Sequence, residues 1–290
     1  MKHAYTLALL SSLLGLAAGR TQAQSLVSGF MMGKGHGTAV ISGTVEGYRK
    51  VFLVPANAEE VPIFKEIRVS SLNLYSTYGV TDQIDLVVSV PYIRSEGQFN
   101  AVGFTKSRAD LQDITGLLKF KSYSTQVGNS ILDLLGVVSV STPLSNYKNE
   151  QGLDYIIAIG NRATKLSTVG VAHLKTTSGV FLTGQAGYSY RTGPVPDAFI
   201  AETKVGYAGR KIYADAYASF QESSSSGTDI LRPGFNDFFP ATRVDYVRLG
   251  ASVFRPLAKG IGLSLGATSY VSGRNVGKST GYSAGITYNF

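Results

Sequence analysis

The sequence closes on the stretch GYSAGITYNF, residues 281–290, and this stretch decides the fold. Successive side chains of a β-strand point to opposite faces, so strict alternation marks a strand with two unlike faces. One face carries Tyr282, Ala284, Ile286, Tyr288 and Phe290, whereas the other carries only small and polar residues. Such a strand needs apolar surroundings on one side and water on the other.

Similar alternation recurs along the chain. Twelve segments of this kind are predicted, at about 38–52, 66–78, 83–94, 109–123, 129–142, 166–176, 179–191, 197–208, 211–222, 241–254, 260–272 and 279–290. Each is long enough to cross a tilted bilayer, which takes about 9 to 11 residues. No window after Gln24 approaches the roughly 18 apolar residues of a spanning helix, so any membrane crossing must use strands.

The connections alternate in length. Links such as YAGRK and KTTSG are short, whereas those around 142–166 and 222–243 are long. Short turns at one end and longer loops at the other are typical of a bacterial outer-membrane barrel. Because lipid offers backbone groups no partner, such a sheet must close on itself, so we expect the last strand to pair with the first. The predicted fold is an all-β, transmembrane, antiparallel up-and-down barrel of about twelve strands.

The first 23 residues have the pattern of a signal peptide. A short basic start precedes the apolar run AYTLALLSSLLGLAA, and TQA supplies small residues for cleavage. We expect residues 1–23 to be removed and residues 24–290 to form a single barrel domain in the bacterial outer membrane. Its partners would then be outer-membrane lipids, the insertion machinery and a small-molecule solute.

Composition excludes several functions. The sequence has no cysteine, and its formal charge of +8 comes from basic residues that form no run, so we predict no nucleic-acid partner. After removal of the signal peptide, His36 and His173 remain, and neither has metal-ligand or catalytic spacing. We therefore expect no cofactor, no metal and no enzymatic activity. The segment GKGHG, residues 33–37, is interpreted as a flexible lead into the first strand.

Several motifs resemble a known family. The stretches LYSTYGVTDQIDLVVSVPYI, DLQDITGLLKFK and VVSVSTPLSNY are similar to outer-membrane transporters grouped with the meta-pathway of phenol degradation. The resemblance covers roughly residues 70–205. It departs from the family pattern where the usual Gly-Asp appears as Gln112 and Asp113. The resemblance implies passive uptake of small, often hydrophobic molecules.

The C-terminal strand also resembles an assembly signal for the insertion machinery. That signal would consist of Tyr282, Ile286, Tyr288 and Phe290.

Charged residues on the polar face of the strands are the candidate lumen residues. They could brace a narrow barrel through ion pairs, or set the electric field that a solute feels. The best candidates for lumen contacts are Lys119, Glu202, Lys204, Tyr213, Asp215, Tyr217 and Arg248.

Aromatic residues suggest two further features. The loop 223–242 clusters Phe235, Phe238 and Phe239, which either form an apolar site at the mouth or pack on a neighbouring loop. Rings near strand ends are expected to form headgroup-level girdles. These rings belong to Tyr75, Tyr78, Tyr92, Phe120, Tyr123, Tyr188, Tyr190, Tyr207, Phe220 and Phe254.

The sequence thus favours a channel for passive uptake of a small, hydrophobic or aromatic solute. A structural or anchoring barrel with a closed lumen is the alternative, and a barrel-type lipid hydrolase is a third possibility. Solute flux distinguishes the first from the second, and lipid turnover identifies the third.

Overall fold

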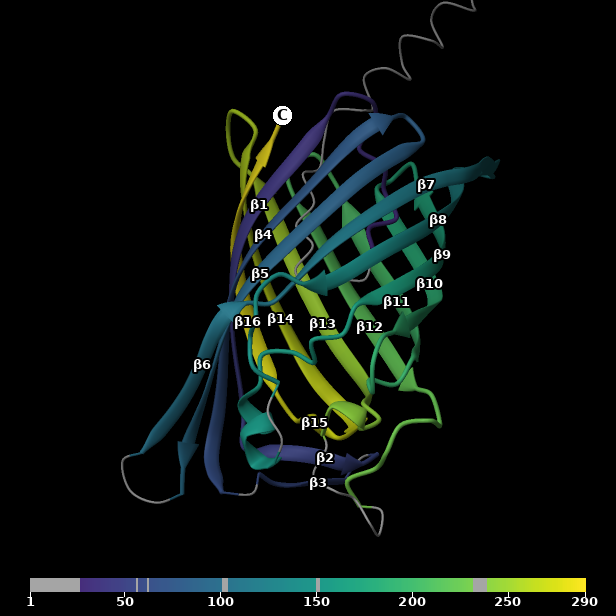
Figure 1. The fold of residues 1–290 in the computed structure, drawn as a ribbon. Helices are drawn as coiled ribbons and strands as arrows, with labels where there is room; N and C mark the ends of the chain where they lie inside the picture. Colours follow the sequence, from purple (N-terminus) through teal and green to yellow (C-terminus); the bar gives the residue numbers. More distant parts are fainter. Residues whose placement is uncertain (1–26, 56, 62, 101–103, 150–151, 232–238) are drawn as a thin grey trace, which may run out of the picture.

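Twelve antiparallel strands form one closed barrel in the computed structural model, which describes residues 27–55, 57–61, 63–100, 104–149, 152–231 and 239–290 (Figure 1). The predicted signal peptide lies outside the described residues. The barrel strands are β1 (Gly37–Tyr48), β4 (Phe64–Thr81), β5 (Ile84–Phe99), β7 (Asp113–Val127), β8 (Ser130–Pro143), β9 (Lys165–Thr176), β10 (Val180–Arg191), β11 (Ala198–Ala208), β12 (Tyr213–Ser223), β13 (Asp245–Pro256), β14 (Ile261–Arg274) and β16 (Thr280–Asn289). The predicted fold class and strand number are confirmed.

The barrel closes between its first and last strands. β16 pairs with β14 on one side and with β1 on the other, in a register that runs from Thr38 opposite Asn289 to Gly47 opposite Thr280. The backbones of Gly37 and Phe290 extend this seam with reciprocal hydrogen bonds of 2.8 and 3.0 Å. The alternating C-terminal stretch is therefore one side of the seam that removes the free sheet edge.

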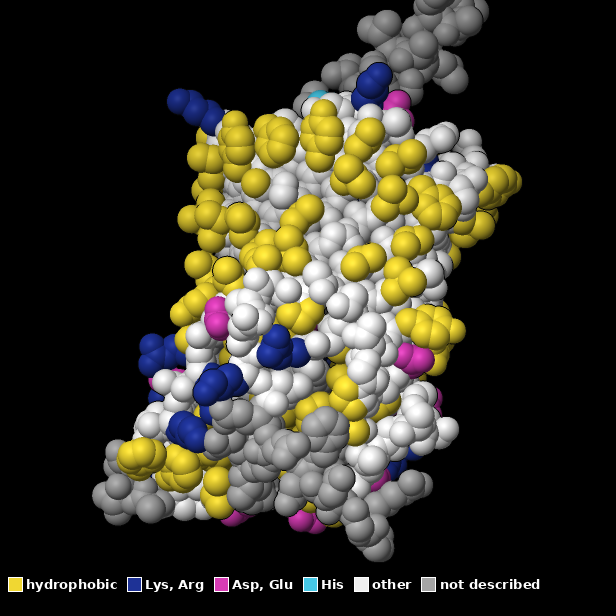
Figure 2. Space-filling model, viewed as in Figure 1, with side chains coloured by type: hydrophobic (Ala, Val, Ile, Leu, Met, Phe, Trp, Pro, Cys, Tyr) yellow, Lys and Arg dark blue, Asp and Glu magenta, His cyan; other side chains and the backbone are white. Residues whose placement is uncertain are grey.

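The two faces of each strand differ as their alternation predicts. On β12, Ala216, Ala218 and Phe220 are exposed, whereas Asp215 and Tyr217 are buried inside. Large apolar side chains on the outer faces of the strands form a broad belt around the barrel (Figure 2). The closed fold and this apolar exterior are those of a bacterial outer-membrane barrel. Among the described residues, no helix is long and apolar enough to span a membrane.

The short turns, the start of β1 and the end of β16 lie at the same end of the barrel (Figure 1). In bacterial outer-membrane barrels the short turns face the periplasm. The opposite, long-loop end holds a small sheet of β2 (Lys50–Val54), β3 (Asn57–Glu60) and β15 (Val276–Gly277). The predicted first strand therefore bends after β1 and continues into this sheet.

The long-loop end also extends the barrel wall. β6 (Thr105–Leu111) continues the line of β7 and pairs with the outer part of β5. Two short helices, η1 (Gly152–Ile157) and η2 (Phe239–Ala241), lie in the loops. On the inner face of the extended wall, Ile157 packs with Phe64 and Ile67.

The aromatic girdle needs two corrections. Eight of the ten expected rings are exposed on the outside, but Tyr75 is half-buried on the inner face of β4, in phase with the buried Thr77. Phe254, however, is completely buried in a cluster inside the barrel. It lies opposite Tyr213 on the neighbouring strand and on the same inner face, because the alternation of β13 points it inward.

Candidate lumen site

A buried network of charged residues occupies the inner faces of β11 and β12. The Nζ of Lys204 lies 3.8 Å from Glu202 Oε1 and 3.8 Å from Asp215 Oδ2. All three side chains are almost fully buried. Alternation brings them together, because Glu202 and Lys204 are two residues apart on β11 and Asp215 lies on the adjacent strand.

Hydrogen bonds stabilise the two carboxylates of this network. Ser219 Oγ and Gln185 Nε2 donate to Glu202 at 2.6 and 2.9 Å. Tyr213 OH and Ser252 Oγ donate to Asp215 at 2.6 and 2.9 Å. A buried charge is tolerated only when it is paired and hydrogen-bonded, and both carboxylates meet this condition.

A second buried ion pair holds the segment that precedes β1. The Nζ of Lys119 lies 3.0 Å from Asp85 Oδ2. The same Nζ donates to the carbonyl oxygen of Phe30 at 2.5 Å, and the backbone N–H of Met32 donates to Asp85 Oδ2 at 3.1 Å. Residues 27–36, hereafter the inner segment, therefore lead from the lumen, where they lie on polar groups of the wall, to the short-turn end, where residues 34–36 are exposed.

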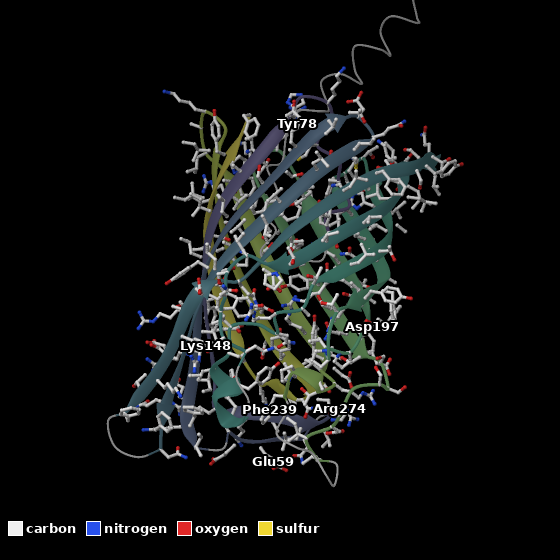
Figure 3. The ribbon with its side chains drawn as sticks, in the orientation of Figure 1. Glu59, Tyr78, Lys148, Asp197, Phe239 and Arg274 are labelled. Atoms are coloured by element: carbon white, nitrogen blue, oxygen red, sulfur yellow. The ribbon has the colours of Figure 1, made fainter. Side chains whose placement is uncertain are left out.

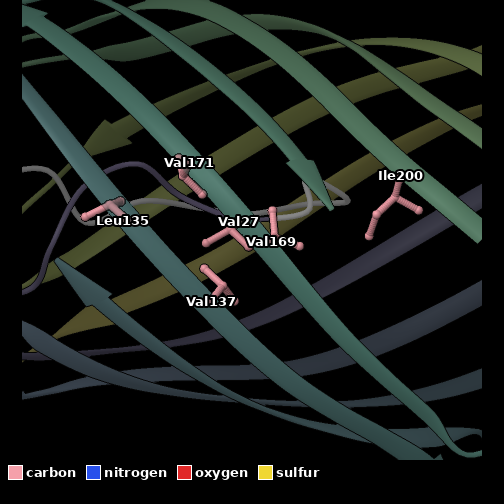
Figure 4. Close-up of a cluster of buried hydrophobic side chains, with 6 residues drawn as sticks. All are labelled: Val27, Leu135, Val137, Val169, Val171 and Ile200. Carbon is pink, nitrogen blue, oxygen red and sulfur yellow. The ribbon is translucent and has the colours of Figure 1, made fainter. Parts of the chain in front are cut away.

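Apolar contacts anchor the inner segment at two further points. Val27 packs among wall residues of β8, β9 and β11 (Figure 4), and these are Leu135, Val137, Val169, Val171 and Ile200. Phe30 packs with Phe181, Tyr213 and Phe254, and its ring centroid lies 4.2 Å from that of His173. The inner segment thus occupies much of the lumen near the short-turn end.

Glycine at position 79 allows the inner segment to lie against the wall. A Cβ at this position would lie 1.9 Å from the carbonyl oxygen of Gly33. The backbone of Gly79 also exchanges hydrogen bonds of 2.9 Å with Gly35 and His36. The expectation that GKGHG is a flexible lead is wrong, because these contacts fix it to the β4–β5 turn.

Arg248 lies beside the same lumen on β13. Its guanidinium is 5.6 Å from the ring centroid of Tyr270 and 5.9 Å from that of Tyr246, within cation–π range. Tyr217 faces it from β12, and its ring centroid is 5.7 Å from Lys204 Nζ. All seven predicted lumen residues therefore lie on inner faces. Five of them belong to the cluster around Lys204, and these are Glu202, Lys204, Tyr213, Asp215 and Tyr217.

Small residues line the inner wall next to this network. Tyr217 borders a small hollow there that has room for about one water molecule. The small side chains that line it from the lumen side come from β1, β13, β14 and β16, and are Thr44, Ser252, Gly266, Thr268, Gly281 and Ser283.

The mouth is covered by two loops that touch. The ring of Phe239 stacks on that of Tyr155 in the 144–164 loop, with centroids 5.3 Å apart. Burial raises the pKa of Tyr155 to about 12, so this phenol stays protonated and donates to Asn161. Arg274 lies nearby at the same end and pairs with Asp229 (Figure 3). Of the two predicted alternatives, Phe239 adopts loop packing; Phe235 and Phe238 lie outside the described residues.

The remaining candidates are placed as follows. Tyr282, Ile286, Tyr288 and Phe290 are each more than half exposed on the outer face at the seam. His36 is exposed at the short-turn end, whereas His173 is buried and hydrogen-bonds Thr183 at 2.8 Å. Within the described ranges, no group of acidic or histidine side chains has the arrangement of a metal site.

Sequence reasoning missed the contacts between the wall and the inner segment. Asp85 and Lys119 are recognisable as polar-face charges, but their partners are backbone groups more than fifty residues away in sequence. Every residue type except proline has the same backbone donor and acceptor, so the sequence does not indicate which backbone groups will be such partners. The glycines at positions 29 and 79 are local signs of a close approach, because a Cβ at either would collide with the other partner.

Comparison with known proteins shows a shared fold. No protein-family model matches the sequence, and no curated protein matches it. The crystal structure of the COG4313 outer membrane channel from Pseudomonas putida F1 has a TM-score of 0.68 and 12% identity, and the alignment covers 95% of this chain and 100% of that chain. At this identity the likeness shows the fold alone.

Two further solved structures are more distant. The β domain of the Bordetella autotransporter BrkA has a TM-score of 0.47 and 13% identity, covering 88% of this chain and 99% of that one. The outer membrane protein OpdK from Pseudomonas aeruginosa has a TM-score of 0.39 and 8% identity, with coverage of 90% and 100%. Neither likeness supports a conclusion about function.

Proposed function

We propose that this protein is an outer-membrane channel that passes a small solute by diffusion, without a covalent step. The polar interior carries the proposal: charged and hydrogen-bonding side chains line a closed barrel whose exterior is apolar. Burying charges costs free energy that an apolar filling would avoid. A lumen whose only role was to fill the barrel would have no need of Glu202, Lys204 and Asp215.

The proposed solute is small and has hydrophobic or aromatic character. This finer proposal rests on the resemblance to the transporters grouped with the meta-pathway of phenol degradation. Aromatic rings beside fixed charges also support it, because such rings offer stacking surface to a flat solute. Tyr213 and Tyr217 carry such rings beside the Lys204 network within the lumen.

The test is single-channel conductance of refolded residues 24–290 in a planar bilayer, with and without phenol and octanoate. The channel proposal expects a small steady current that these solutes reduce. A correctly folded barrel that neither conducts nor takes up radiolabelled phenol into liposomes would contradict it. Fatty-acid release from the same liposomes would instead identify a lipid hydrolase.

A structural barrel with a closed lumen is the second candidate. One observation favours it: the inner segment and the buried ion pairs both lie within the lumen. Silence in the conductance and uptake assays, with wild-type stability intact, is the result that this candidate expects.

A further inference from the structure

Four exposed basic side chains gather on two neighbouring turns at the short-turn end. Arg210 and Lys211 lie between β11 and β12, whereas Arg255 and Lys259 lie at the end of β13 and in the turn that follows it. The two turns are adjacent, because Tyr213 at the start of β12 pairs with Phe254 on β13. The register therefore sets Lys211 beside the end of β13.

These four cations have no acidic partner among the described residues. Exposed arginines near the other end differ, since Arg68 and Arg94 pair with glutamates at 3.0 and 2.5 Å. In the described short turns the single acidic residue is Asp82, which lies between β4 and β5. β1 and β16 separate that turn from the β13–β14 turn, so Asp82 does not balance the positive charge of these four cations.

The cations lie at the edge of the apolar belt. The neighbouring outward side chains Tyr207, Ile212, Leu257 and Ile261 are each at least 43% exposed. Lysine and arginine at such an edge extend their charged ends to the level of the lipid headgroups. Phosphate groups of the lipids lie at this level, so the charge and the position are complementary to them.

We propose that Arg210, Lys211, Arg255 and Lys259 form a binding surface for the phosphate groups of anionic phospholipids. Ordinary solvation explains single exposed cations, but not four on adjacent turns beside an apolar edge. The attraction of a basic residue near an anionic membrane corresponds to about a fivefold preference for each charge. The surface would orient the barrel in its leaflet and select its neighbouring lipids.

The experiment counts lipids retained by the refolded full barrel. Residues 24–290 are equilibrated with equal amounts of phosphatidylglycerol and phosphatidylcholine in detergent, and the bound lipids are identified by native mass spectrometry. Two variants, Lys211→Gln/Arg255→Gln and Arg210→Gln/Lys259→Gln, each remove two charges. The second changes only turn residues, so the test does not depend on a strand substitution.

A matched control removes two charges from the other end. Lys50→Gln/Lys65→Gln replaces exposed lysines of β2 and β4. We expect each test variant to lower the preference for phosphatidylglycerol by up to about 25-fold, at about fivefold for each charge, while the control keeps it. The exchange Lys211→Arg/Arg255→Lys retains both charges and should keep the preference as well.

Three results would overturn the proposal. They are a preference unchanged in both test variants, an equal loss in the control, and displacement of the lipid by sodium phosphate but not by sodium chloride of equal ionic strength. The last would indicate a site for soluble phosphate. Lipid counting does not depend on conductance, so this inference and the proposed channel fail independently.

Discussion

Lys204 is the residue on which the interior charge balance most directly depends. It lies between Glu202 and Asp215, and all three are buried on adjacent strands. Removing one member of a buried ionic group leaves the others uncompensated, and that cost exceeds the net contribution of the intact group. At Gly79 the constraint is space and not charge, because a side chain there would overlap the carbonyl oxygen of Gly33.

Replacing Lys204 by methionine should lower the free energy of unfolding by about 3–5 kcal/mol, because Glu202 and Asp215 then remain buried with excess negative charge. Urea titration of the refolded barrel in lipid measures it. Lys65→Met, at an exposed site, is the control. If Lys204→Met lowered the free energy of unfolding by less than the control does, water would already screen the charges of the network.

Gly79→Ala should destabilise the barrel by about 1–3 kcal/mol, because the new methyl group would overlap the carbonyl oxygen of Gly33. Gly116→Ala is the matched control, since a Cβ there meets nothing within 4 Å. The same titration compares them. Equal stability of both variants would mean that the inner segment shifts away from the β4–β5 turn at little cost.

β16 shows how one element serves two requirements. Its inner face is small and lines the lumen, with Gly281, Gly285 and Thr287 buried. Its outer face presents apolar rings at the seam with β1. Exposed aromatic rings on the terminal strand are available to an assembly factor before closure, and to lipid afterwards.

Phe290→Ser should reduce the amount of folded protein in the outer membrane of cells, because it removes the terminal ring of the proposed assembly signal. Heat-modifiability on gels of membrane fractions measures the folded amount. Refolding of the purified variant into detergent should stay close to wild type, since the strand pairing is backbone-based. A parallel loss in both assays would attribute the effect to stability instead.

At the scale of the whole molecule, the inner segment and the barrel form one interior. Val27 and Phe30 pack against strands that lie far along the chain, and Lys119 holds the segment by its backbone. A solute that crosses the proposed channel must therefore pass the inner segment or displace it. Arg248 and the Lys204 network contribute to the electric field in the rest of the lumen.

The double variant Asp85→Asn/Lys119→Met should increase single-channel conductance, because it removes the ion pair that holds the inner segment at Phe30 and Met32 without leaving a lone buried charge. Planar bilayer recording measures the change. Glu66→Gln/Arg68→Met removes an exposed ion pair and is the control. Unchanged conductance in the double variant would show that the remaining contacts, those of Gly79, Val27 and Phe30, keep the segment in place.

Arg248→Glu should shift ion selectivity toward cations if this side chain faces the conducting path. Reversal potentials in a salt gradient measure the shift, with Arg68→Glu on the outer surface as the comparison. Identical reversal potentials for wild type and Arg248→Glu would place the path elsewhere in the lumen.

The sequence by itself determined the strands, their number and which side chain faces which way. These are local properties, because alternation along a strand fixes the two faces residue by residue. Asp215 and Tyr217 could therefore be assigned to the lumen without a structure. Phe254 was misassigned because its position near a strand end suggested a girdle, although its phase is inward.

Only the tertiary structure decided what fills the lumen. The inner segment has few residues that strongly favour a helix or a strand. Its contacts join backbone groups of Met32 and Phe30 to side chains 53 and 89 positions away. Such contacts depend on barrel closure and on the stagger between strands, which bring distant residues to one level. The alternation of side chains along one strand does not specify the stagger between strands. The sequence therefore predicts the strands of the wall, whereas the closed barrel determines which residues lie inside it.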